Sequence, residues 1–213
     1  KKSKKTVAIY SLISVAVILT QVASLISYKM PPTFYDLFSD TRAIEYTLNE
    51  EGNGYIVTSI YRGTSQNVCV PATFNNKPVI GIAKGALVDD ELFTNYKVTS
   101  ITFGTETTDE SGATVLESNL QYIEDGAIVN DNITSLTIPS SVTGLGSNAI
   151  KSTSLTTLQY EARADFDISY LQNCSALSKI VMANKNVGKI SSLDGMSSSV
   201  VIEVAKDIYN EYR

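Results

Sequence analysis

The sequence predicts an α/β, β-rich solenoid of about six coils that is built on a parallel sheet. Short apolar segments recur from residue 68 to residue 204, and the central anchors of the last four lie 22 residues apart. These anchors are Leu136, Leu158, Ile180 and Ile202. A further apolar anchor follows two residues after each of them. A fixed period of this length is typical of a solenoid, in which each unit buries its apolar face against the next one.

The first two coils are interrupted by insertions. Val68 and Ile101 anchor these coils, and the longer spacings that follow each anchor place extra residues near 88–97 and 104–119. Both insertions are rich in Asp and Glu. The later coils have no insertions. A second pattern recurs in the part of each of the first three coils that follows the apolar anchors. It reads apolar–x–x–x–Ala–apolar and stands at 82–87, 123–128 and 145–150. We expect a short helical turn with a small residue facing the sheet at each of these sites.

The predicted solenoid has a cap at each end. In residues 44–66, two alternating segments flank a Gly-rich turn, which predicts an antiparallel β-hairpin that covers the first coil. Residues 67–213 form the solenoid, and its C-terminal cap is an amphipathic segment with Ile208 and Tyr212 on its apolar side. The sequence therefore predicts an array that is closed at both ends and complete.

The N-terminal region is typical of a transmembrane segment. Residues 1–5, with four lysines, form a basic tail, and no charge follows from residue 7 to residue 27. This run is long enough to cross a hydrocarbon core of about 30 Å, and the basic flank favours a cytoplasmic N-terminus. We expect residues 6–28 to be an uncleaved transmembrane helix and residues 29–43 a juxtamembrane linker. A cleaved signal peptide is the alternative, but the run is long and offers only a weak cleavage site near residues 22–24.

Polar residues recur on one side of this predicted helix. They are Ser11, Ser14, Gln21 and Ser24, at intervals close to i+3, i+4 and i+7. Small and polar side chains let transmembrane helices approach one another and form hydrogen bonds. The stripe therefore favours packing against another integral membrane protein. The alternative is that these side chains bond back to their own helix without a partner.

Residues 133–155 carry the clearest family resemblance. Pro139, Val142, Leu145, Ala149 and Ile150 match the consensus of the BspA-like leucine-rich repeats, also called the Treponema pallidum type, and Cys174 stands at the cysteine position of that consensus. The resemblance covers roughly residues 44–213. It implies a curved parallel-sheet solenoid on a bacterial surface, with roles in adhesion and protein binding. The chain departs from the pattern in its short array and its predicted membrane helix.

Composition argues against several function classes. The four N-terminal lysines are part of a net charge of −5, so residues 6–213 carry −9, which disfavours binding to nucleic acid. The absence of histidine removes the commonest acid–base catalyst and metal ligand. Cys69 and Cys174 are too few for a thiolate zinc site, and their separation along the solenoid predicts two free thiols. We therefore expect no catalytic residues, no cofactor and no metal. Asp165 and Asp167 are expected on the rim of a coil.

Two regions are candidates for partner binding. The outward face of the parallel sheet includes Thr102, Thr137 and Gln159, and its hydroxyl groups are also what strand propensity alone would produce. The first insertion carries Leu92, Phe93 and Tyr96, and we favour it because insertions in solenoids often form the binding edge. A glycan is a weaker alternative, since the sheet face lacks aromatic platforms. The acidic residues suggest a solvated rim rather than a calcium site.

Together these features predict a non-catalytic, single-pass protein of the bacterial cell membrane with an extracellular solenoid. We expect it to bind another protein as an accessory subunit of a membrane complex. The alternative is a free cell-surface adhesion or ligand-binding protein that the helix merely tethers.

Overall fold

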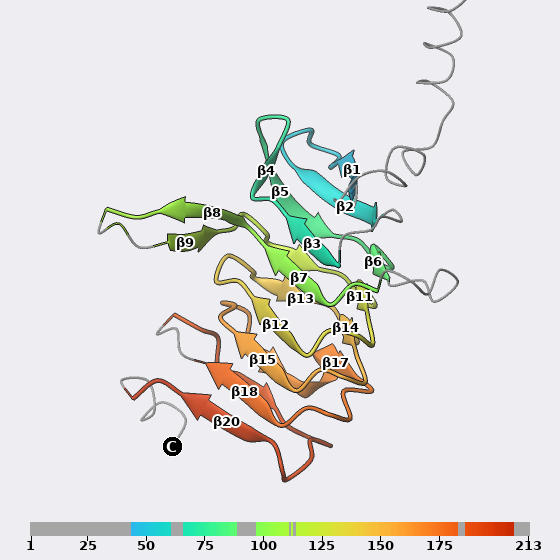
Figure 1. Ribbon diagram of the computed structural model, residues 1–213, viewed down its shortest axis with the longest axis vertical. Coiled ribbons are helices and arrows are strands. Elements are labelled where there is room, and N and C mark those ends of the chain that lie inside the picture. Colours follow the sequence, from blue (N-terminus) through green and yellow to red (C-terminus); the bar gives the residue numbers. More distant parts are fainter. Residues whose placement is uncertain are drawn as a thin grey trace, which may run out of the picture.

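The computed structural model describes residues 44–60, 66–88, 97–110, 112, 114–182 and 186–206. In this part of the chain the backbone winds into an elongated solenoid whose strands stack along one axis (Figure 1). Each coil contributes a four-residue strand to the front, and the side strands have two or three residues except for the six-residue β5 (Lys77–Ile82). The described residues contain almost no helix, because the one helical element is the short 3-10 helix η1 (Ile168–Tyr170).

Six parallel strands form the front of the solenoid. These front strands are β3 (Asn67–Val70), β7 (Ser100–Phe103), β12 (Ser135–Ile138), β15 (Thr157–Tyr160), β18 (Lys179–Met182) and β20 (Val201–Val204). β3 pairs with β7, and β12, β15, β18 and β20 form a continuous ladder. The predicted repeat is confirmed, because the register joins Leu136 to Leu158, Leu158 to Ile180 and Ile180 to Ile202.

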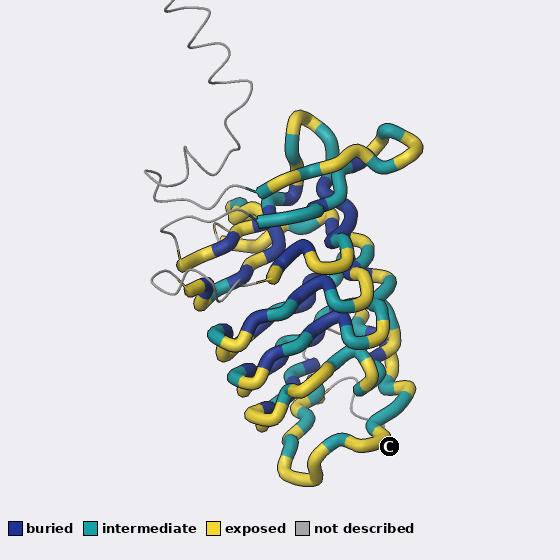
Figure 2. The backbone as a smooth tube through the Cα atoms, turned by 90° about the vertical axis from the view of Figure 1, so that its right-hand side faces the viewer, coloured by how far each residue is buried: buried dark blue, intermediate teal, exposed yellow. Residues whose placement is uncertain are grey.

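The apolar anchors of the front strands form the core. Leu136, Leu158 and Ile180 are buried, as are the anchors two residues further on, such as Tyr160 and Met182. Alternate residues point inward because successive side chains of a strand lie on opposite faces. Figure 2 shows buried residues gathered along the coils while exposed residues collect at their turns.

Short parallel strands close the other sides of the coils. One side contains β5 (Lys77–Ile82), β10 (Tyr122–Ile123) and β13 (Gly144–Leu145), followed by β16 (Phe166–Asp167) and β19 (Ile190–Ser192). The other side contains β6 (Leu87–Val88), β11 (Ile128–Val129), β14 (Ile150–Lys151) and β17 (Leu171–Gln172).

The helical turns predicted between these two sides were wrong. At each site the chain makes a β-turn, closed by a backbone hydrogen bond from the alanine N–H to the carbonyl three residues earlier. The residue before the alanine has a positive φ, at Gly85 (73°), Gly126 (62°) and Asn148 (56°). A left-handed residue at the third turn position cannot continue a helix, and glycine and asparagine adopt it most readily. The described part of the chain is therefore an almost entirely β solenoid and not the predicted α/β solenoid.

The predicted N-terminal hairpin is present. β1 (Ile44–Leu48) pairs antiparallel with β2 (Tyr55–Ile60), and β2 continues the side sheet by pairing in parallel with β5. The short strand β4 (Thr73–Phe74) pairs with the start of β5. The ring of Phe74 stacks on Tyr46 at a centroid distance of 4.1 Å, and burial raises the pKa of Tyr46 to about 12. This hairpin occupies the place of a preceding coil on the open edge of the side sheet.

The last coil is packed less completely than the others. Ile202 and Val204 are only half-buried, whereas Ile180 and Met182 one coil earlier are fully buried. The predicted C-terminal cap over residues 207–213 lies outside the described residues. So do the basic tail (1–5), the transmembrane helix (6–28) and the linker (29–43). Within the described part of the chain, no helix has the length and apolar character needed to cross a membrane.

Candidate protein-binding surface

The outward residues of the front strands form two columns that run along the solenoid, and we call these columns the front face. The first column is Asn67, Ser100, Ser135, Thr157, Lys179 and Val201. The second column is Cys69, Thr102, Thr137, Gln159, Val181 and Glu203. All twelve are exposed or half-buried. The front face is therefore a preformed surface, held by the buried anchors behind it.

The structure brings two of the three predicted front-face residues directly together. Thr137 and Gln159 are paired in the register of β12 and β15, whereas Thr102 is paired with Cys69 in the separate β3–β7 ladder. β7 and β12 lie next to each other without a continuous ladder between them. The candidate residues Leu92, Phe93 and Tyr96 of the first insertion lie outside the described residues, as do Ser11, Ser14, Gln21 and Ser24.

Asn130 lies at this interruption. Its side-chain amide donates a hydrogen bond of 3.0 Å to the carbonyl oxygen of Val98, just before β7. Its side-chain oxygen accepts hydrogen bonds from the N–H groups of Asn132 and Ile133, at 2.7 and 3.1 Å. A buried side chain therefore connects the two parts of the solenoid, where the insertion has lengthened the repeat.

Hydroxyl groups just before the front strands hold successive coils together. The Thr156 hydroxyl donates to the carbonyl oxygen of Thr134 at 2.9 Å, and the Ser178 hydroxyl donates to that of Thr156 at 3.1 Å. These hydroxyls thus have a structural role, because they satisfy carbonyls of the preceding coil. The hydroxyls of Thr102, Thr137 and Thr157, by contrast, belong to the front face.

The C-terminal part of the front face contains charged side chains and an exposed apolar side chain. The Lys179 ammonium lies 2.8 Å from the Glu203 carboxylate, and the Gln159 amide donates a hydrogen bond to the carboxylate of Glu161. Val201 is 56% exposed, the largest exposure among the large apolar side chains of the described residues. The exposed hydroxyls of β12 thus give way to a mixed polar and apolar patch on β18 and β20.

The acidic residues in the coils act mainly as hydrogen-bond acceptors. The Asp131 carboxylate accepts from the N–H of Thr153 at 2.7 Å, and this backbone hydrogen bond lowers the pKa of Asp131. Asp165 accepts from the N–H of Lys189, and Asp167 accepts from Ser169 and Ser191. The hydrogen bond from the Ser169 N–H is the main cause of a lowered pKa at Asp167. Within the described residues, no three His, Cys, Asp or Glu side chains are grouped so that they could hold a metal ion.

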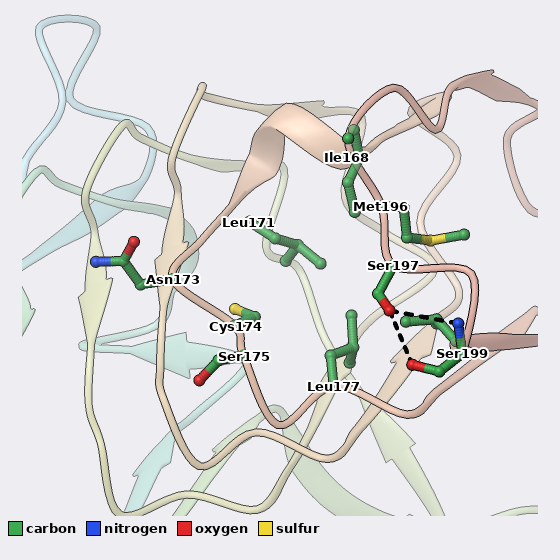
Figure 3. Close-up of a pocket in the computed structure, with 11 residues that line it drawn as sticks. Ile168, Leu171, Asn173, Cys174, Ser175, Leu177, Met196, Ser197 and Ser199 are labelled. Carbon is green, nitrogen blue, oxygen red and sulfur yellow. Dashed lines mark hydrogen bonds between the residues drawn. The ribbon is translucent and has the colours of Figure 1, made fainter.

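A pocket of about 330 Å³ opens between the segments that lead into β18 and β20 (Figure 3). Its apolar lining includes Leu171, Leu177 and Met196, and serines stand along its margin. The thiol of Cys174 also lines the pocket and donates to the carbonyl oxygen of Gln172 at 3.6 Å. Both cysteines are free, as predicted. The pocket extends to Val200, just before β20, so it adjoins the incompletely packed last coil.

Besides the front face, the structure has an exposed β-hairpin that the sequence did not predict. In the acidic insertion at 104–119, β8 (Thr105–Thr108) and β9 (Thr114–Glu117) pair antiparallel. We call this hairpin the arm, since it projects from the end of β7 away from the coils (Figure 1). The threonine- and valine-containing segments on either side of Gly112 are a hairpin signal that could have identified it.

Comparison with known proteins supports the repeat type. Residues 106–194 match the family model described as the BspA type leucine rich repeat region, in six copies. No curated protein and no solved structure matches the chain significantly. The matched stretch begins in β8 and ends after β19, so β3, β7 and β20 lie outside it. The repeats within this stretch are therefore similar to the BspA type, a similarity that suggests protein–protein interaction or adhesion.

Proposed function

We propose that this chain is a non-catalytic protein-binding module of a bacterial cell surface, in which the front face contacts another protein. The register of the front strands is the observation that carries the proposal. It aligns outward side chains coil after coil while the inward anchors are buried. A surface that is rigid before binding loses little conformational entropy on association. The repeat type supports the same conclusion.

We further propose that residues 6–28 anchor the module in the membrane and that it serves as an accessory subunit of a membrane complex. The support is the uncharged run of residues 7–27 and its polar stripe. A glutamine that faced lipid would leave its amide unsatisfied, whereas a neighbouring helix can satisfy it. A partner helix would therefore explain Gln21 best. The solenoid would lie outside the cell, because the basic residues 1–5 favour a cytoplasmic N-terminus.

The first experiment is gentle detergent extraction of the full chain from its native membrane, followed by native-gel sizing and mass spectrometry. A variant with Ser14, Gln21 and Ser24 changed to Leu is run beside it. Stoichiometric co-migration with one integral membrane protein, lost in the Leu variant, is the expected result. Migration of both forms alone would contradict the accessory-subunit role and favour the tethered adhesion protein.

A second pair of variants tests the front face. Thr137→Arg and Gln159→Arg place two bulky charges on the outward side of β12 and β15 without changing a buried anchor. We expect this double variant to lose the partner and to stay folded, with a modestly lower unfolding midpoint because the register places the two like charges opposite each other. Gln172→Arg is the matched control, because Gln172 is exposed on β17, on another side of the coil. Equal partner recovery from all three forms would exclude the front face.

A further inference from the structure

The arm is a separate two-stranded sheet. Its register pairs Thr105 with Glu117, Glu106 with Leu116, Thr107 with Val115 and Thr108 with Thr114. Every residue of β9 is exposed, including Val115 at 37% and Leu116 at 44%. Neither β8 nor β9 pairs with another described strand. The arm therefore presents apolar side chains and two unpaired strand edges to solvent.

The base of the arm is fixed to the first coil. The Thr105 hydroxyl accepts a hydrogen bond from the N–H of Ala72 at 3.0 Å, and the Asn119 amide donates to the Ala72 carbonyl oxygen at 3.1 Å. Gly104 has a φ of 144°, and a Cβ atom there would lie 2.4 Å from the carbonyl oxygen of Glu117. Glycine is thus required where the two chain segments cross. These contacts hold the arm in a defined direction.

An isolated two-stranded hairpin is marginally stable in water. Its outer edges carry N–H and C=O groups that a third strand can satisfy, which is how many domains bind extended peptides. The side chains of the arm also suit a neighbouring strand. Leu116 and Val115 offer apolar contacts on opposite faces. Glu106 lies opposite Leu116 across the ladder, and Glu117 follows Val115 on the same face of β9.

The negative charge of the arm indicates which kind of strand can pair with its edges. Residues 104–119 contain three glutamates and one aspartate but no Lys or Arg. Within the described residues, Glu106, Glu110 and Glu117 form no ion pair. Two arms from separate copies would place like charges opposite each other, which is destabilising in a sheet. A second copy is therefore disfavoured, and a basic strand is favoured.

We propose that the arm receives an extended segment of the partner protein, with Lys or Arg at alternate positions, as a third β-strand. The inference rests on the proposed function and adds a second contact site and its chemistry. The basic side chains lie beside Glu106 or Glu117, and β-branched or other apolar residues lie beside Val115 or Leu116. Cross-strand pairs of opposite charge and of apolar residues stabilise such a sheet.

Synthetic peptides test the chemistry on the full chain. The probe is a short peptide that alternates Lys and Val, and its comparison is a peptide of the same charge in which two central valines are replaced by proline. Proline removes the N–H groups that a ladder needs, so only the first peptide can add as a strand. We expect the Lys–Val peptide to bind and to slow amide exchange in β9. Equal binding of the two peptides would overturn the proposal, because it would show charge attraction without strand pairing.

Charge variants complete this test. Glu106→Gln with Glu117→Gln is expected to weaken binding of the Lys–Val peptide about tenfold, since the cross-strand ion pair at Glu117 on β9 is lost together with the attraction of Glu106 on the neighbouring strand. Glu45→Gln with Glu50→Gln removes the same charge from the N-terminal hairpin region and should leave affinity unchanged. An equal loss of peptide affinity in both double variants would overturn the proposal, because binding would then depend only on the net charge of the protein.

Photo-crosslinking in the native cells separates this inference from the proposed function. A photoreactive amino acid replaces Val115 in one form and Thr137 in another. Crosslinks from position 115 to a basic, strand-forming segment of a protein that position 137 also reaches support both proposals. Crosslinks from position 137 alone, or from position 115 to a segment that is not basic, overturn the arm proposal and leave the front face standing. The absence of crosslinks from either position overturns both.

Discussion

Asn130 and Ser152 occupy the same position in consecutive coils, but their hydrogen bonding differs. The position is set by the register that pairs Val129 with Lys151. The Asn130 side chain is 2% exposed and makes three hydrogen bonds to backbone groups. Among the described residues, the buried hydroxyl of Ser152 has no hydrogen-bond partner. Substitutions at the two positions should therefore have opposite effects on stability.

Asn130→Ala should destabilise the solenoid. The substitution leaves the Val98 carbonyl and the N–H groups of Asn132 and Ile133 without these partners, in the interior between β7 and β12. An unsatisfied buried group costs about 1–3 kcal/mol, so we expect the free energy of unfolding to fall by about that amount or more. Urea denaturation of the full chain measures the change. A loss well below 1 kcal/mol would show that water or other groups replace the asparagine.

Ser152→Ala is the matched substitution and should not destabilise the protein. It removes a buried hydroxyl that has no hydrogen bond, and burying such a group is unfavourable. We expect the free energy of unfolding to stay equal or to rise by up to about 1 kcal/mol. The same denaturation experiment tests it. A decrease comparable to that of Asn130→Ala would mean that the serine hydroxyl has an ordered partner.

These two residues also show what the sequence can and cannot predict. The 22-residue spacing predicted the front strands and their register, because every coil must bury the same apolar positions against its neighbour. Asn130 has no counterpart of the same type in the coils that follow. Its role depends on its hydrogen bond to the Val98 carbonyl oxygen, 32 residues away in the sequence, and a spacing pattern does not reveal such a contact.

The errors have physical causes as well. Between the side strands, the alanine suggested a helical turn, but the left-handed residue before it decided the conformation. The arm was not predicted because all but one of the residues of β8 and β9 are exposed, so these strands carry no apolar–polar alternation that periodicity could detect. Of the predicted contact residues, the sheet periodicity placed Thr102, Thr137 and Gln159 correctly on the outward side. The identity of a partner for these residues depends on a second chain, and a single sequence does not encode it.

The hydrogen bond to Asp131 predicts a pH dependence of stability. The Thr153 N–H lowers the pKa of Asp131 in the folded state below the ordinary value of 3.8. A lowered folded-state pKa stabilises the protein above the unfolded-state pKa, and this contribution is lost as the pH falls through the folded-state value. Asp131→Asn keeps an accepting oxygen but cannot titrate. We therefore expect the wild type to lose more stability than Asp131→Asn between about pH 4 and pH 2. Parallel profiles of unfolding free energy would contradict this.

Gly104→Ala should release the arm without unfolding the solenoid. The new Cβ would clash with the Glu117 carbonyl oxygen, and alanine rarely adopts a φ of 144°. We expect amide exchange in β8 and β9 to become fast while the front strands keep their protection. Gly112→Ala is the control: its φ of 82° is also strained, but no atom of the other described residues lies within 4 Å of the new Cβ. Retained protection of the arm in Gly104→Ala would show that the crossing can widen to admit a side chain.

The two thiols should react at different rates. Cys69 is exposed on the front face, whereas Cys174 is half-buried in the pocket, and burial raises the pKa of the Cys174 thiol. The thiolate is the reactive form, so a raised pKa and a covered sulfur both slow alkylation. We expect iodoacetamide to modify the Cys174→Ser variant, which retains Cys69, much faster than the Cys69→Ser variant. Equal rates under native conditions would mean that the coil around the pocket opens often enough to expose Cys174. Repeating the reaction in urea provides the control, because unfolding should make the two rates alike.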